Sequence, residues 1–225
     1  MYAIPSKDGM RNQASPPSSA ASRMVGDGDP DVAREEALVA ALRAILRSSP
    51  RFLEMLAAVR SCDPPDWMVG GGVLRDIVWD HLHCYPAPAQ HKDVDVAFFD
   101  PADCSRERER DVQHALATAL PGVAWDPKNQ AGVHLWYDRH FGGCAVPPLT
   151  STADGVATWP ETVTCVAVRL GADGEIEVMA PYGLTDMFAL TLRHNPRRVS
   201  RDLFRQRIVE KSILQRWPRV LVIDG

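Results

Sequence analysis

The chain has 225 residues, of which 45% are hydrophobic and 24% are charged, and its formal net charge is −4. This is the composition of a globular protein with one sizeable core. No apolar run approaches the ~18 residues that a membrane-spanning helix needs, which excludes a transmembrane protein and a membrane partner.

The N-terminal stretch is rich in proline, serine and alanine and has no apolar signal segment. We therefore expect residues 1–30 to form a disordered leader. Five cysteines are scattered without a C-x-x-C pair, which is typical of a reducing compartment and predicts a cytoplasmic protein. Cys84 with His81, His83 and His91 offers ligand types that suit zinc, but the spacing matches no standard zinc site.

Hydrophobic periodicity predicts short strands mixed with helices. Alternating apolar residues in "VTCVAVRL" and "IEVM", joined by the turn sequence "GADGE", predict a β-hairpin. Helices are predicted over residues 31–49, 52–59, 73–83, 106–120, 185–192 and 200–217, and strands over 67–69, 93–99, 123–126, 133–137, 163–170 and 176–179. Such a mixture indicates an α+β fold with a mixed sheet.

Two acids lie one residue apart in the apolar stretch "DVDVAFFD". Because side chains alternate along a strand, Asp93 and Asp95 share one face while the apolar residues point to the core. Two ionised carboxylates so close repel each other, and one pKa rises unless a cation lies between them. The expected cation is Mg²⁺, or Mn²⁺ in its place, because Mg²⁺ takes hard oxygen ligands and keeps positions for substrate phosphates.

A glycine triplet precedes these acids where a strand meets a helix. Gly70, Gly71 and Gly72 let the backbone turn tightly, so that N–H groups can approach a phosphate. The N-terminus of the following helix favours anions. Arg75 in its first turn adds a charged donor, and Asp76 beside it can orient the guanidinium. The triplet matches neither a P-loop nor a dinucleotide-binding fingerprint.

The order G-G-x-x-R-D and then D-x-D resembles the nucleotidyltransferase superfamily that shares the palm of DNA polymerase β, including the tRNA CCA-adding enzymes. Several stretches resemble more closely an uncharacterised bacterial nucleotidyltransferase-like family. These are "DVDVAFFD", "KNQAGVHLWY", "WPETVTCVAVRL" and "APYGLTDMFALTLRHNP". The resemblance covers residues 66–217. It implies a palm-like mixed sheet flanked by helices, in a nucleotidyltransferase-like domain of residues 31–192.

The resemblance also implies roles for single residues. Asp93 and Asp95 would hold the catalytic metals, and Gly71 and Gly72 would lie by the triphosphate. The superfamily uses a third carboxylate from a neighbouring strand. Glu177 is the expected residue because it sits within a strand, whereas the alternative Glu175 lies beside a turn and the alternative Glu161 lies in "WPET".

Two polar segments are further candidates for binding. In "PKNQ", Lys128 could contact the triphosphate, and Asn129 and Gln130 the base or sugar, unless the segment is only a polar turn. Residues 193–225 are expected to form a basic helical segment packed on the same domain. Between residues 193 and 219 it has nine basic and two acidic residues. Such a segment can face phosphates or nucleic acid, or it can be a solvated helix face.

Together these features predict a Mg²⁺-dependent nucleotidyltransferase. It would move a nucleoside monophosphate from an NTP to an unknown acceptor, with a small molecule or a protein hydroxyl favoured over an RNA end. Nucleic acid remains a possible partner through the basic segment. Two alternatives stay open, namely a palm-fold module that senses nucleotide without chemistry and a toxin that nucleotidylates its target.

Overall fold

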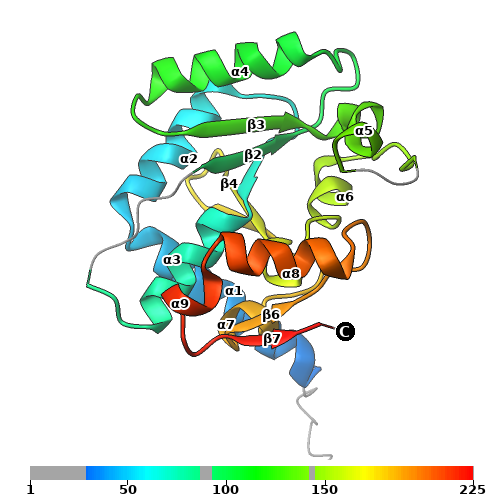
Figure 1. Cartoon of the computed structure of the whole chain (residues 1–225). Coiled ribbons are helices and arrows are strands. Elements are labelled where there is room, and N and C mark those ends of the chain that lie inside the picture. The colour runs from blue at the N-terminus through cyan, green and yellow to red at the C-terminus, as the bar shows by residue number, and fades with distance from the viewer. Residues whose placement is uncertain (1–28, 87–92, 142–144, 225) are drawn as a thin grey trace, which may run out of the picture.

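The computed structural model describes residues 29–86, 93–141 and 145–224 (Figure 1). The helices are α1 (Pro30–Arg47), α2 (Pro50–Cys62), α3 (Gly72–Leu82), α4 (Arg106–Ala119), α5 (Tyr137–Phe141), α6 (Thr152–Val156), α7 (Thr185–Phe188), α8 (Arg201–Glu210) and α9 (Ile213–Arg216), with short 3-10 helices η1 (Gln130–Leu135) and η2 (Thr162–Thr164). The expected leader lies outside the described residues, except that Asp29 caps α1 and Pro30 already belongs to it. None of the described helices has the length and hydropathy to cross a membrane.

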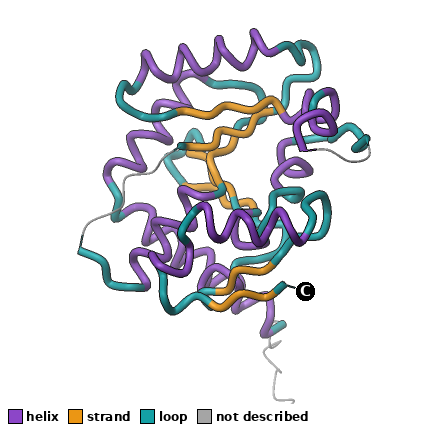
Figure 2. The backbone as a smooth tube through the Cα atoms, in the orientation of Figure 1, coloured by secondary structure: helices purple, strands orange, loops and turns teal. Residues whose placement is uncertain are grey.

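The strands form two separate sheets (Figure 2). They are β1 (Met68–Gly70), β2 (Val94–Phe98), β3 (Trp125–Asn129), β4 (Ala167–Leu170), β5 (Ile176–Met179), β6 (Thr191–Arg193) and β7 (Leu221–Ile223). The larger sheet has the order β3-β2-β1-β4-β5, in which β2 and β3 are parallel and the other pairs antiparallel. The predicted α+β class with a mixed sheet flanked by helices is therefore confirmed.

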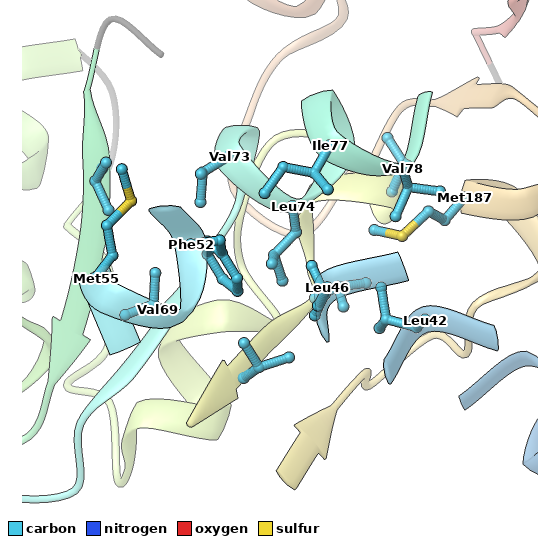
Figure 3. Close-up of a cluster of buried hydrophobic side chains, with 14 of the residues drawn as sticks. Leu42, Leu46, Phe52, Met55, Val69, Val73, Leu74, Ile77, Val78 and Met187 are labelled. Carbon is cyan, nitrogen blue, oxygen red and sulfur yellow. The ribbon is translucent and has the colours of Figure 1, made fainter. Parts of the chain in front are cut away.

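One face of the larger sheet packs against helices and forms the main core. Val69 of β1 and the apolar residues of β2 contact side chains of α1, α2 and α3 in one continuous cluster (Figure 3). Val94, Val96 and Phe98 are at most 1% exposed. Burial of so much apolar surface is the main force that fixes the sheet and thereby orients its other face.

The opposite face is built from small residues and faces the site. Ala97 and Ala167 pack there with Val156 at the end of α6, and Trp159 contacts this second cluster. Helix α6 was not among the predicted helices, and Ser151 caps it by accepting the Asp154 N–H at 3.1 Å. Small side chains leave space above the middle of the sheet, which larger ones would fill.

Some expected elements are different in the structure. Residues 133–137, expected to be a strand, lie in η1 and α5, because the chain turns after Asn129, whose side-chain oxygen accepts the Ala131 N–H at 3.2 Å. The single helix expected over residues 200–217 is divided at Ser212, where φ is 51°. The parallel pair of β6 and β7 was not predicted. The C-terminal segment thus carries a strand as well as two helices.

Candidate functional site

A cavity of about 340 Å³ opens on the small-residue face of the sheet. Its floor comes from the ends of β1, β2 and β3, and one wall comes from the C-terminal segment. It is lined by acids, cations and aromatic side chains, among them Asp93, Asp95, Asp126, Arg75, Lys128, Arg198, Arg207, Lys211, Trp136, Tyr137 and Trp159. This combination of charge and aromatic surface in one pocket is typical of a ligand site.

Three carboxylates line the floor of this cavity. Asp95 lies within β2, and Asp93 directly precedes the strand on the same face. Strand β3 runs parallel to β2 with Asp126 directly beside Asp95 in the register, so both side chains point to the same face. Asp126 was not among the residues expected at the site. Its signal is the alternation in "WDPKN", where Trp125 is buried and Asp126 and Lys128 are not.

Burial and the two neighbouring acids perturb Asp95. The pKa of Asp95 is raised from 3.8 to about 6, chiefly by burial and then by the negative charges of Asp93 and Asp126. The positive charges of Lys211 and Arg207 act in the opposite direction without cancelling this effect. Without a cation between the acids, the site therefore favours a protonated Asp95 at mildly acidic pH.

The three glycines of the triplet have different roles in the structure. Gly71 has φ of 71°, and a Cβ there would lie 3.0 Å from Asp95 Oδ2 and 3.1 Å from the Trp159 ring. Gly70 lies inside β1, and a Cβ there would lie 2.5 Å from the Val166 carbonyl oxygen. Gly71 and Gly72 line the cavity, whereas Gly70 is not among the described lining residues. Gly70 thus allows β1 to pack against β4, and Gly71 brings the backbone to the acids.

Arg75 lines the cavity but is firmly held by the protein. It is 4% exposed and donates two hydrogen bonds to Asp76, at 3.0 and 2.6 Å. Its guanidinium lies over the rings of Trp79 and Trp217, 5.6 and 5.1 Å from the centroids. The predicted orienting role of Asp76 matches this geometry. Arg216 also bonds Asp76, at 2.8 Å, which ties the start of α3 to α9.

The segment "PKNQ" splits between the two faces of β3. Lys128 and Gln130 line the cavity, and the Lys128 ammonium forms an ion pair with Asp126. Asn129 points the other way and is 1% exposed. Its side chain donates to the Asp100 and Asp103 carbonyls at 2.8 and 2.9 Å, so it organises a loop and does not reach the cavity.

The structure does not bring Glu177 to the cavity. It lies on β5, at the far end of the sheet from β3, and forms an ion pair with Arg169 at 2.6 Å. Glu175 pairs with Arg47 on the outside of α1. Glu161 is 3% exposed and accepts a bond from Arg207 at 3.0 Å, so it positions a cation of the cavity wall. The neighbouring-strand carboxylate at the site is Asp126.

The basic segment contributes both to the cavity and to the fold. Arg198, Arg207 and Lys211 line the wall that faces the acids. Other cations hold the segment in place, as Arg193 does with Asp186 at 2.8 Å. Some cations of the basic segment therefore face the cavity, where a phosphate could bind, and others hold the segment on the fold.

The donor set fits a divalent cation that shares its ligands with a substrate. Among the described residues, no three acidic, histidine or cysteine side chains converge closely enough to hold an ion by themselves. His91 of the alternative zinc set lies outside the described residues. Mg²⁺ needs only one or two carboxylates, because water and substrate phosphates complete its coordination. Asp93, Asp95 and Asp126 meet that requirement, and a cation would offset the burial and the repulsion that raise the pKa of Asp95.

A family model described as nucleotidyltransferase matches residues 57–222. The chain belongs to this nucleotidyltransferase family. The family relationship expected from the glycine triplet and the two acids is confirmed at this level, and the chain is accordingly an enzyme of nucleotidyl transfer.

Two solved structures are similar to this nucleotidyltransferase. An NMR structure described as revealing a CCA-adding enzyme head domain matches with a TM-score of 0.69 and 26% identity, over 82% of this chain and 95% of that one. A complex of a CCA-adding enzyme with CTP matches with a TM-score of 0.41 and 15% identity, over 79% of this chain and 48% of that one. No curated protein matches the chain.

Proposed function

We propose that this protein transfers a nucleoside monophosphate from a Mg²⁺-bound NTP to an acceptor hydroxyl. The observation that carries the proposal is the cavity in which three carboxylates of adjacent strands face the cations of the C-terminal segment. Asp93, Asp95 and Asp126 are the proposed metal-holding residues, and Mn²⁺ is an alternative to Mg²⁺. The metal would supply charge stabilisation for the attacking and leaving oxygens.

The triphosphate would lie between the start of α3 and α8. The first turn of α3, which begins at Gly72, has backbone N–H groups without a partner inside the helix, and the dipole of α3 favours an anion. The Gly71 N–H, in contrast, already donates to the Val166 carbonyl oxygen at 3.0 Å. Arg207 and Lys211 lie on the facing wall and would bind the β- and γ-phosphates. Glu161 fixes the Arg207 guanidinium, which reduces the entropy lost on binding.

In the reaction, the acceptor oxygen forms a bond to the α-phosphorus while the bond from that phosphorus to the bridging oxygen breaks. Pyrophosphate leaves with that electron pair. The acceptor proton passes to a carboxylate at the floor, for which Asp126 is the proposed base because it lies at the edge of the sheet. The products are a nucleotidylated acceptor and pyrophosphate.

We favour a small molecule or a protein hydroxyl as the acceptor over an RNA end, and we propose a cytoplasmic location on the basis of the scattered cysteines. The test is incubation of the purified protein with Mg²⁺, each α-³²P-labelled NTP and a lysate of its source organism. A labelled product made by wild type and not by the Asp93→Asn/Asp95→Asn variant supports the proposal. The sensitivity of the product to nuclease or protease identifies the acceptor class.

Two other outcomes separate the alternatives. Binding of Mg·NTP in calorimetry without transfer to any acceptor would favour a nucleotide sensor. Growth arrest on expression that requires Asp95 would favour a toxin. Absence of Mg·NTP binding would contradict both the enzyme and the sensor.

A further inference from the structure

Two grooves extend from the same carboxylates along the outer edge of the sheet. Each has a volume of about 550 Å³ and lies between α4 and β3. Both include Asp126 and Arg110, and one of them also includes Asp93. In Figure 1, α4 runs along the β3 edge, whereas α8 lies on the other side of β2. The acids therefore stand between two separate concave surfaces.

The in-line geometry of the displacement assigns a different part of the substrates to each of these two surfaces. In a displacement at the α-phosphorus, the attacking and leaving oxygens lie roughly in line on opposite sides of the phosphorus. The proposed pyrophosphate side is the α3 and α8 wall, with Arg207 and Lys211. The attacking hydroxyl must then approach from the other side of the acids, which is the side of α4.

Of the two grooves on that side, the one that contains both Arg106 and Arg110 presents positive charge, and we call it the α4–β3 groove. Arg106 and Arg110 are exposed residues four positions apart on α4, so they share one face of the helix. Among the described residues neither forms an ion pair. Glu109 also lines the groove, but its carboxylate already accepts the Asn129 backbone N–H at 2.9 Å. An anionic group bound there would meet two available guanidinium groups close to Asp126.

We propose that the α4–β3 groove is the acceptor site and that the acceptor carries a phosphate group near its reactive hydroxyl. Arg106 and Arg110 bind that phosphate, and the hydroxyl points to the floor beside Asp126. This inference rests on the proposed function and names the substrate class of that same site. The bonds made and broken are those of the nucleotidyl transfer, and the acceptor phosphate is unchanged by the reaction.

The phosphate can belong to a phosphorylated small molecule or to a nucleic acid end, and two probes distinguish these sources. Calorimetry measures ribose 5-phosphate against ribose, and a short oligoribonucleotide separately. Each is titrated with and without Mg²⁺ and an NTP analogue that has a methylene bridge between the α- and β-phosphates. We expect ribose 5-phosphate or the oligoribonucleotide to bind at least tenfold more tightly than ribose.

The deciding variant is Arg106→Ala/Arg110→Ala. Loss of a hydrogen bond to a charged group weakens binding about tenfold, so we expect the dissociation constant of the phosphate-bearing probe to rise about tenfold for each arginine. Binding of the NTP analogue should be unchanged. The matched control is Arg34→Ala/Arg47→Ala, which removes two exposed arginines from α1 and should leave both affinities as in wild type.

The outcomes separate this inference from the proposed function. If the wild type binds no probe in a phosphate-dependent manner, or if the α4 variant binds as tightly as wild type, the acceptor site is wrong even when the NTP analogue binds. If the analogue fails to bind but the phosphate-bearing probe binds through Arg106 and Arg110, the groove is a phosphate site and the proposed NTP site is wrong. An unchanged thermal midpoint shows that the variant is folded.

Discussion

Asp95→Asn should make the metal-free protein more stable at neutral pH. Burial, and then the negative charges of Asp93 and Asp126, raise the pKa of Asp95 to about 6, so its ionised form is disfavoured in the folded state. Asparagine has nearly the same shape and no charge. It removes the cost of burying a charge and the repulsion from Asp93 and Asp126 without opening a cavity.

The size of the effect follows from the pKa. A rise from 3.8 to about 6 corresponds, at about 1.4 kcal/mol for each pKa unit, to about 3 kcal/mol of unfolding free energy. The folded protein holds this proton more tightly than the unfolded chain does. Its stability therefore falls as the pH rises from about 4 to about 6 and stays lower above that range. For a chain of this size, about 3 kcal/mol is a shift of roughly 6–12 °C in the midpoint.

The assay is thermal unfolding of wild type and Asp95→Asn in EDTA at pH 3.5 and pH 7.5. The midpoints should nearly coincide at the lower pH, where Asp95 is mostly protonated in both states, and separate at the higher pH. Asp111→Asn, a change at an exposed carboxylate of α4, should show no such separation. Added Mg²⁺ should stabilise wild type more than Asp95→Asn, because the cation needs the carboxylate that the variant lacks.

A result in which Asp95→Asn is equally stable or less stable at pH 7.5 would refute this reasoning. It would mean that Arg207 and Lys211 already neutralise the acids in the folded protein. The need for a divalent cation at the floor would then have lost its physical basis.

Three further predictions concern other residues. Asp126→Asn should lower nucleotidyl transfer by about a hundredfold or more, as expected for a lost catalytic base. Glu177→Gln should change the transfer rate less than about twofold. A reversed ranking of the two variants in a labelled-NTP assay would contradict the placement of the third acid. Gly71→Ala should weaken Mg·NTP binding because its φ of 71° and the 3.0 Å approach to Asp95 admit no Cβ, while Gly72→Ala, with its nearest atom at 3.9 Å, should bind normally in calorimetry. Asn129→Ala should lower the unfolding free energy in urea by about 2–4 kcal/mol and leave the Mg·NTP affinity of the folded protein unchanged.

The fold class could be predicted from the sequence because local patterns determine it. Alternation placed Asp93 and Asp95 on the face opposite the apolar residues of β2, and the structure has them there. Asp126 could not be predicted in the same way. Its place beside Asp95 depends on the parallel pairing of β2 with β3 across the intervening α4, and no local pattern encodes which strands become neighbours.

The error over Glu177 has the same origin. Its strand was predicted correctly at residues 176–179, but the order of the strands puts β5 at the opposite end of the sheet from β3. The basic segment shows a related limit. Its charge was plain from the sequence, but the break at Ser212 and the docking of α8 decide that Arg207 and Lys211 face the acids.

Asn129 and Asp95 show how polar residues of the fold differ from those of the site. Asn129 is buried with hydrogen-bond partners for both its oxygen and its nitrogen, so a ligand has nothing to add. Asp95 is placed beside two further acids, and its raised pKa shows that the protein alone does not balance its charge. A chain selected for stability alone would have neutralised this floor. The proposed cation that arrives with the substrate would balance this charge, and the expected stability of Asp95→Asn and its expected loss of transfer would then be two consequences of one arrangement.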